Sequence, residues 1–159
     1  MKLSEIVQLI LCIFVCQLVG FIGSFFTAPA IPTWYAALSK PSFTPPNWIF
    51  GPAWITLYFL MAIAAYLVWR QGLNVPGVKT ALLLFVLQLI LNGLWSPAFF
   101  GMRSTVAGGI VIVLLWIAII LTIWKFFPLS VPAAVLLVPY LLWVSYATVL
   151  NVSLIVLNT

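Results

Sequence analysis

The sequence predicts an all-α membrane protein, a single bundle of five transmembrane helices over residues 1–159. Two observations of composition and one of pattern lead to this fold class. Hydrophobic residues make up 66% of the chain and charged residues 4%, whereas roughly a quarter of a soluble domain is charged. The mean hydropathy is +1.32. Five apolar runs reach the length of about 20 residues that a helix needs to cross a bilayer, and they cover residues 6–26, 47–69, 80–100, 106–126 and 133–157.

The first span, residues 6–26, carries small residues on one helical face, at four-residue spacing: Cys12, Cys16, Gly20 and Ser24. Such ridges let helices approach closely in lipid, so we expect helix packing here rather than thiol chemistry. Lys2 precedes the apolar run as it would in a signal peptide. The run continues past Gly20 without a convincing cleavage site, so we expect a retained helix.

The connection between the first two spans, residues 27–46, is long and rich in aromatic residues and prolines. The 21 residues from Trp34 to Trp54 hold six aromatic residues, four prolines and one charge, Lys40. Prolines stiffen the chain and aromatic rings offer large flat contact areas. This composition predicts a rigid aromatic lid over an apolar cavity.

The second span, residues 47–69, begins at Asn47, a plausible N-cap after two prolines. Pro52 is expected to bend the helix near its entrance. Trp54 and Tyr58 follow at helical spacing, one to two turns deeper than an interfacial aromatic belt would place them. They therefore predict an aromatic face inside the bundle.

The third span, residues 80–100, contains Gln88, Asn92 and Ser96 at four-residue spacing, with Trp95 adjacent. A polar stripe in hydrocarbon must face protein or water. Hydrogen bonding between helices and the lining of a cavity explain the stripe equally well. The fourth span, residues 106–126, has a small-residue patch near its start and no pattern that indicates chemistry.

In the fifth span, residues 133–157, Trp143, Ala147 and Asn151 share one helical face. A large ring, a small residue and an amide in a row are typical of a pocket wall. They are also typical of an ordinary contact in which Ala147 admits a neighbouring helix. The pattern leaves both interpretations open.

The residues that are missing exclude several kinds of function. The chain has no His, and Glu5 is its one acidic residue. General acid/base catalysis and ion coupling through intramembrane carboxylates therefore lack their usual groups. Cys12 and Cys16 do not make up a zinc or iron ligand set, so we predict neither a catalytic residue nor a metal site.

The basic residues all lie near span ends, where they anchor a helix at the interface, and do not indicate a nucleic-acid partner. Four belong to the N-terminal side (Lys2, Arg70, Lys79 and Lys125) and two to the other side (Lys40 and Arg103). By the positive-inside rule, this distribution predicts a cytoplasmic N-terminus.

Four blocks of the sequence resemble the signature blocks of the TspO/MBR family, the translocator proteins: WYxxLxKPSFTPPNWIFGPAW, LYFLMAIAAYLVW, LNGLWSPAFFG and PYLLWVSYATVLN. The likeness spans nearly the whole chain, and the first block is specific. It implies a five-helix bundle, usually homodimeric, that binds porphyrins, sterols and benzodiazepine-type drugs. We therefore expect an integral, multi-pass protein, a homodimer in the cell membrane of a microbe.

The resemblance also implies which residues bind the ligand. The cavity would be walled by Trp54 and Tyr58 of the second span, Asn92 and Trp95 of the third, and Trp143, Ala147 and Leu150 of the fifth, with Trp34 and Tyr35 at the start of the lid. The cholesterol-recognition pattern of the animal members is missing, because no Tyr or basic residue follows in residues 149–154. The resemblance therefore implies sterol binding less strongly than it implies tetrapyrrole binding.

The implied ligand is a tetrapyrrole such as protoporphyrin IX, or another apolar small molecule, and no cofactor is required. A haem would lack its commonest axial ligand, so a metal-free porphyrin is favoured. Lys40 or Arg103 would pair with propionates if either lies beside the pocket. The implied roles are porphyrin transport, signalling or a stress response. The alternatives are light-dependent porphyrin degradation with a tryptophan as electron donor, passive carriage of apolar ligands, and a purely structural bundle.

Overall fold

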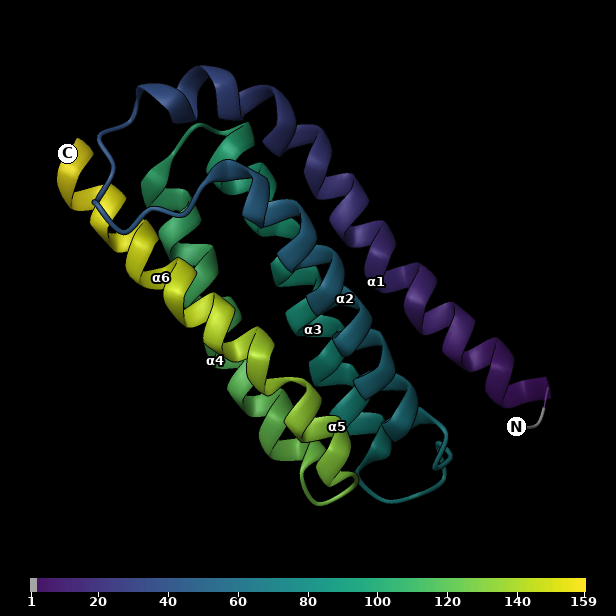
Figure 1. Ribbon diagram of the computed structural model, residues 1–159. Coiled ribbons are helices and arrows are strands. Elements are labelled where there is room, and N and C mark those ends of the chain that lie inside the picture. The colour runs from purple at the N-terminus through teal and green to yellow at the C-terminus, as the bar shows by residue number, and fades with distance from the viewer. Residues whose placement is uncertain (1–2) are drawn as a thin grey trace.

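Within residues 3–159, which the computed structural model describes, every regular element is a helix (Figure 1). Five helical spans in this range are long and apolar enough to cross a membrane: Leu3–Tyr35, Asn47–Trp69, Val78–Gly101, Thr105–Phe126 and Val131–Asn158. The predicted all-α, five-span fold class is confirmed. Lys2, one of the predicted anchors, lies outside the described residues.

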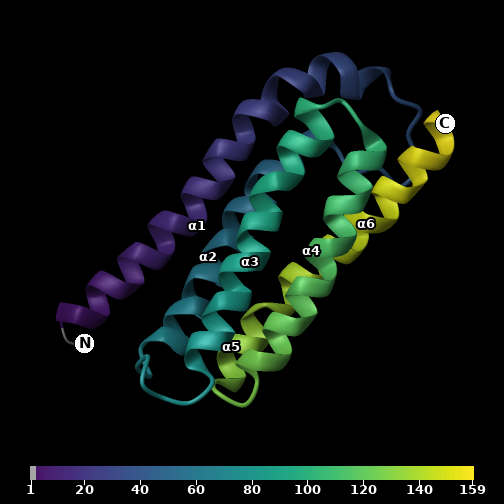
Figure 2. The ribbon, with the colours of Figure 1, turned by 180° about the vertical axis from the view of Figure 1, so that it is seen from behind.

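The chain crosses the bundle in an up-and-down order, which Figure 2 shows from behind. The elements are α1 (Leu3–Ala30), the π-helical turn η1 (Ile31–Tyr35), α2 (Asn47–Trp69), α3 (Val78–Ser96), the π-helical turn η2 (Pro97–Gly101), α4 (Thr105–Phe126), α5 (Val131–Leu136) and α6 (Val138–Asn158). Serine side chains cap the N-termini of α4 and α5: Ser104 accepts a hydrogen bond from the Ala107 amide (3.1 Å), and Ser130 accepts one from the Ala133 amide (3.3 Å).

The first helix is longer than its hydropathy predicts. The expected end at residue 26 was wrong, because the chain stays helical through η1, and only residues 38–46 form a non-helical connection, which we call the strap. Pro29 lies inside α1 and Pro32 inside η1. The Thr33 hydroxyl donates to the Pro29 carbonyl (2.8 Å), and the wider π turn accommodates a residue without a backbone donor.

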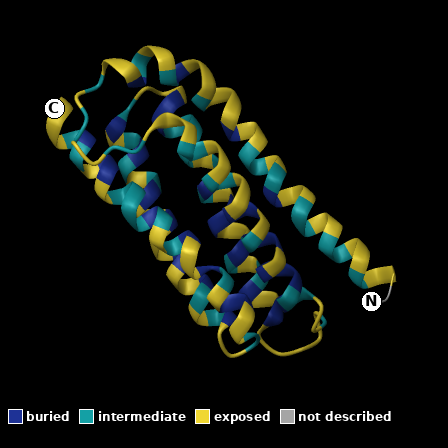
Figure 3. Ribbon diagram, in the orientation of Figure 1, coloured by how far each residue is buried: buried dark blue, intermediate teal, exposed yellow. Residues whose placement is uncertain are grey.

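Helix α1 packs on α2 through the small-residue ridge. Cys16 is buried, and a side chain at Gly20 would run into the ring of Tyr58. This confirms the expectation of close packing for these two positions, whereas Ser24 is exposed. Most of the remaining α1 surface is also exposed (Figure 3), as in a helix that faces lipid.

The two ends of the bundle differ in what covers them (Figure 1). One end carries η1, the strap, η2 and the C-terminal end of α6, and we call it the strap end. The other carries the connection from α2 to α3 and the turn from α4 to α5, where Gly72 and Gly77 take positive φ values of 103° and 89°.

Candidate functional site

A cavity of about 630 Å³ lies among the helices in the half of the bundle toward the strap end. Its walls come from α1 with η1, α2, α3 with η2, α4 and α6. Among the described residues, none that lines the cavity carries a charge. A cavity with uncharged walls suits an apolar molecule and rejects an ionised group.

Eight of the nine residues expected at the ligand site line this cavity: Tyr35, Trp54, Tyr58, Asn92, Trp95, Trp143, Ala147 and Leu150. Trp34 does not line it. Its ring packs edge-on against Phe99, with 5.3 Å between centroids, and against Phe100 at 6.5 Å. Because η1 is helical, the neighbouring side chains of Trp34 and Tyr35 point in different directions, and only Tyr35 reaches the cavity.

A chain of hydrogen bonds joins three helices at the deeper side of the cavity. Tyr58 Oη donates to Asn92 Oδ1 (2.5 Å), and Asn92 Nδ2 donates to Tyr140 Oη (2.8 Å). Tyr140 in turn donates to Gln88 Oε1 (2.9 Å). Both interpretations of the polar stripe therefore hold for Asn92, which lines the cavity and also links α2, α3 and α6.

Tyr140 was not among the expected site residues, although it completes this chain. It is fully buried behind the cavity wall. Its position beside Pro139 near the start of the fifth span gave no signal of a partner, because hydrogen-bonding capacity in sequence does not say which helix will supply the other group.

Aromatic rings form the walls. Trp54 leans over Tyr58 with 5.5 Å between centroids and 32° between planes, and it meets Tyr140 edge-on at 6.2 Å. Between α2 and α6, Phe50 meets Trp143 edge-on at 6.1 Å. These pairs keep the large flat surfaces of Trp54 and Trp143 in fixed orientations.

The two π-helical turns meet at the strap end and close the cavity there. Trp95 stacks on Phe99 at 5.1 Å and 17°, and Tyr35 packs edge-on against Phe100 at 5.8 Å. Gly108 of α4 makes room, since a Cβ there would lie 2.5 Å from the Phe99 ring. Sequence reasoning missed Phe99 and Phe100, because a π turn changes which side chains after it share a helical face. Such turns are common at functional sites.

The strap lies on α6 rather than over the cavity, so the lid assigned to residues 27–46 requires correction. The cavity is lined by Thr27, Ala28, Ile31 and Tyr35, all helical, and by none of residues 38–46. Helix α1 with η1 thus provides the cover that the strap was expected to give. The physical reason is that a continued helix lets the backbone N–H and C=O groups of residues 27–35 form hydrogen bonds within the segment.

Two α6 side chains hold the strap. Asn158 accepts from the Ser39 amide and donates to the Ser39 carbonyl, both at 2.9 Å. Tyr146 donates to the Phe43 carbonyl (2.6 Å), and its ring packs edge-on against Phe43 at 6.3 Å. The strap is therefore fixed to α6 at two points.

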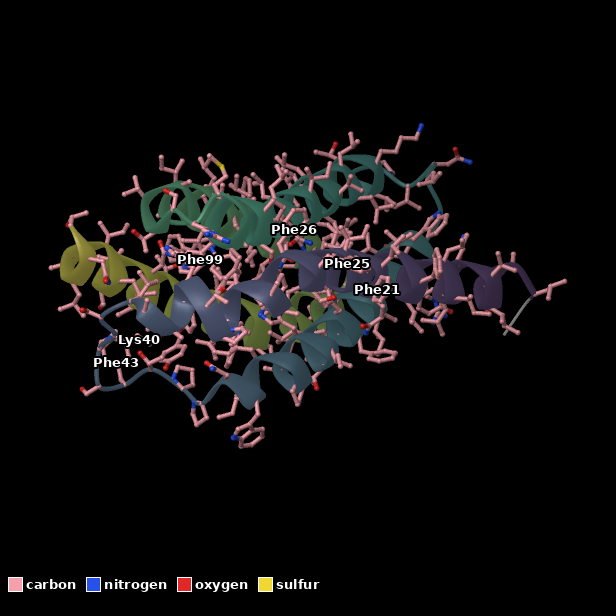
Figure 4. All side chains as sticks on the ribbon, turned by 90° about the horizontal axis from the view of Figure 1, so that it is seen from above. Phe21, Phe25, Phe26, Lys40, Phe43 and Phe99 are labelled. Carbon is pink, nitrogen blue, oxygen red and sulfur yellow. The ribbon has the colours of Figure 1, made fainter. Side chains whose placement is uncertain are left out.

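Lys40 serves the strap and not the cavity lining (Figure 4). Its ammonium donates to the carbonyls of Ala36 (3.2 Å) and Leu38 (3.1 Å) and lies 4.8 Å from the centroid of the Tyr35 ring. Arg103 does not line the cavity either. Neither basic residue lines the cavity, although Lys40 lies against Tyr35 of its wall, and pairing with propionates stays a prediction.

The face of Trp143, Ala147 and Asn151 is a pocket wall, because all three line the cavity. It is a helix contact as well: a Cβ on Gly109 of α4 would lie 2.8 Å from Asn151 Oδ1. Among the described residues, neither polar atom of the Asn151 side chain has a hydrogen-bond partner, and the same holds for Trp95 Nε1. A buried polar group without a partner costs free energy.

Comparisons with known proteins agree over nearly the full length. The model described as TspO/MBR family matches residues 12–157. The chain is 47% identical over 155 residues to the "Tryptophan-rich protein TspO" of Chlorobaculum tepidum, which covers 98% of each chain. The protein of the same name from Archaeoglobus fulgidus is also 47% identical over 155 residues, 97% of this chain and 99% of that one. The human "Translocator protein" is 41% identical over 132 residues, 82% of this chain and 78% of the human one.

Proposed function

This chain belongs to the TspO/MBR family as a TspO-like multi-pass membrane protein, and on that premise we propose that its cavity binds a metal-free tetrapyrrole such as protoporphyrin IX. Other flat, apolar molecules of benzodiazepine type are proposed as ligands of the same cavity. The observation that carries the proposal is the cavity of about 630 Å³, which is lined by Trp54 and Trp143 and has uncharged walls.

Affinity in this proposal comes from burial and stacking of the ring. Trp54, Trp95 and Trp143 each offer a large apolar surface to the cavity. Because burial of an ionised group in apolar walls is costly, the propionates of a porphyrin would remain outside the enclosed part. The chain has no His to act as an axial ligand, which favours a metal-free ring.

The proposed role is to hold the ligand for transport, signalling or a stress response rather than to hydrolyse it. Glu5, in the first turn of α1, is the one acidic residue of the sequence and does not line the cavity. Among the described residues, the cavity wall therefore offers no carboxylate, His or Lys as a general acid or base.

The test is a titration of the purified protein with protoporphyrin IX, followed through the porphyrin absorbance. Trp54→Ala combined with Trp143→Ala is expected to weaken binding at least about tenfold, since each aromatic pair is worth about 0.5–1.5 kcal/mol beyond its buried area and about 1.4 kcal/mol is a factor of ten.

The matched control is Trp124→Ala, which removes the same ring from a position that is 65% exposed on α4 and does not line the cavity. It should leave the affinity unchanged. Equal affinity of the wild-type protein and the Trp54/Trp143 double variant would rule out this cavity as the tetrapyrrole site.

A further inference from the structure

The cavity has an opening, and the exposed residues among its lining show where it is. Six lining residues are exposed on the outer surface, and every one belongs to α1 or α2: Phe21, Ser24, Ala28, Asn47, Gly51 and Ile55. Phe21 is 61% exposed and Ile55 54% exposed. The lining residues of α3, α4 and α6 are buried or half-buried. The opening therefore lies between α1 and α2.

Direct contacts between α1 and α2 mark the deep limit of this opening. Gln17 Nε2 donates to the Ile55 carbonyl (3.1 Å), and Gly20 lies against the Tyr58 ring. The exposed residues of α1 follow these contacts in the chain, and Asn47 and Gly51 precede them. Because α1 runs toward the strap end and α2 runs away from it, the opening extends from these contacts toward the strap end.

The opening begins at Asn47, the first residue of α2, and continues to the depth of the hydrocarbon. Gly51 lies four residues into α2 and Ile55 eight, which places them about 6 and 12 Å along the helix at 1.5 Å per residue. The hydrocarbon of one leaflet is about 15 Å thick, half of about 30 Å. On the α1 side, Phe21 packs edge-on against Phe25, at 5.0 Å, on the outer face of the helix (Figure 4).

The route through the strap end is closed in this structure. Tyr35 of η1 is 4% exposed and packs on Phe99 and Phe100, whereas the strap does not line the cavity and is bonded to Asn158 and Tyr146 of α6. A ligand that entered from water at this end would have to separate these contacts, whereas one dissolved in the leaflet meets an open side.

The geometry points to lateral exchange: the ligand enters and leaves the cavity from the hydrocarbon of the strap-end leaflet, between α1 and α2. We call this opening the doorway, and Gly51 keeps it open. Apart from its chain neighbours and the backbone of its own helix, no atom lies within 4 Å of a Cβ built on Gly51, so this rim position has open space for a larger side chain. This inference rests on the proposed function for the identity of the ligand, a flat molecule that partitions into the bilayer.

The route can be tested without a porphyrin. A cysteine placed on the far wall, Ala147→Cys, is exposed in liposomes to an apolar maleimide that dissolves in the bilayer or to a sulfonated maleimide that does not cross it. Labelling is counted as the increment over the parent chain, which contains Cys12 and Cys16. We expect that only the apolar reagent labels the new cysteine. Gly51→Trp, or Ala28→Phe on the opposite rim, should slow this labelling at least about tenfold, which corresponds to a barrier raised by about 1.4 kcal/mol.

Two controls separate the doorway from general effects. Val149→Trp adds the same ring to α6 at an exposed position outside the cavity and should leave the labelling rate unchanged. Asn158→Ala releases Ser39 of the strap and should also leave it unchanged. The inference is overturned if the apolar reagent does not label Ala147→Cys, if neither rim variant slows it, or if Asn158→Ala accelerates it.

Protoporphyrin IX delivered from donor vesicles gives a second readout. A blocked doorway slows association and dissociation by the same factor, so Gly51→Trp should lower both rates while Kd stays within about twofold. A raised Kd with an unchanged association rate would make Gly51 a wall residue and overturn the doorway. If the wild-type protein does not bind protoporphyrin IX, the proposed function fails, and the maleimide experiment still decides the route.

Discussion

At the scale of single residues, Asn92 joins two tyrosines through its amide: Oδ1 accepts from Tyr58 and Nδ2 donates to Tyr140. The side chain is 5% exposed, so these bonds are made away from water. A buried network of this kind is stabilising only while each member keeps its partner. Asn92 therefore shapes the cavity first of all by holding α2, α3 and α6 together.

Tyr140→Phe should destabilise the protein by about 1–3 kcal/mol, because it leaves Asn92 Nδ2 and Gln88 Oε1 buried without the hydroxyl that now joins them. Thermal unfolding in detergent would measure the change.

Tyr66→Phe is the matched control for that substitution. Tyr66 is 5% exposed, and among the described residues its hydroxyl has no hydrogen-bond partner. Its loss should be neutral or stabilising, because a buried polar atom without a partner costs free energy. Equal destabilisation by the two Tyr→Phe changes would show that the hydrogen-bond chain contributes nothing specific.

At the scale of elements, one glycine on each of α1 and α2 affects how the two helices pack. Gly20 sits where a Cβ would collide with the Tyr58 ring, and Gly51 sits where a Cβ meets open space. The same residue type thus has opposite packing consequences on the two helices. Both positions are helical, so Ala would be favoured at each by propensity alone.

Gly20→Ala should lower the thermal stability, since overpacking costs about 1–3 kcal/mol and exceeds the gain of about 1 kcal/mol in helix propensity. Gly51→Ala should raise stability by up to that propensity gain. The comparison is made by parallel thermal unfolding in detergent. A stabilising Gly20→Ala would mean that Tyr58 can move aside at little cost.

The strap is an element without regular structure whose order depends on α6. Asn158 satisfies both backbone groups of Ser39. Asn158→Ala should accelerate hydrogen–deuterium exchange of peptides within residues 38–46, because unbonded amides exchange from locally open states.

Peptides of the α2 core in the same sample provide the internal reference and should exchange as in the wild-type protein. If exchange within residues 38–46 does not change in Asn158→Ala, then Tyr146 and Phe43 alone fix the strap.

At the scale of the whole molecule, charge is distributed unequally between the two ends. Arg70, Lys79 and Lys125 lie at the end opposite the strap, and Lys40 and Arg103 at the strap end. The positive-inside rule predicts that the richer end, with the N-terminal end of α1, lies in the cytoplasm.

In whole cells, an impermeant maleimide should therefore label Thr159→Cys at the strap end. It should label Asn74→Cys, in the connection from α2 to α3, only after lysis. The reverse pattern would invert the predicted orientation and would place the strap in the cytoplasm.

Most of the fold was predictable because it depends on quantities that a sequence carries locally. The five apolar runs correspond to the five spans, since the desolvation of backbone in a bilayer leaves helices as the stable form. Four-residue spacing placed Trp143, Ala147 and Asn151 on one helical face, and this face lines the cavity. Positions that the family resemblance selected, such as Trp54 and Tyr58, also line it.

Other features depend on partners that are distant in sequence, and only the tertiary structure decided them. The hydropathy pattern predicted an end of the first helix that is too early. Pro29 and Pro32 are typical of loops in a sequence, but in the structure they lie inside α1 and the π turn η1. The strap was expected over the cavity and instead lies on α6, where Asn158 and Tyr146 bond it.

By itself the sequence determined the class of the protein, the number of its spans and the uncharged aromatic character of its site, because these follow from composition and period. The tertiary structure decided which side chains close the cavity and which leave it open. Tyr35 reaches the cavity while Trp34 does not, and Gly51 stands at an opening while Gly20 stands at a contact. These differences arise from packing between helices, which a linear pattern does not encode.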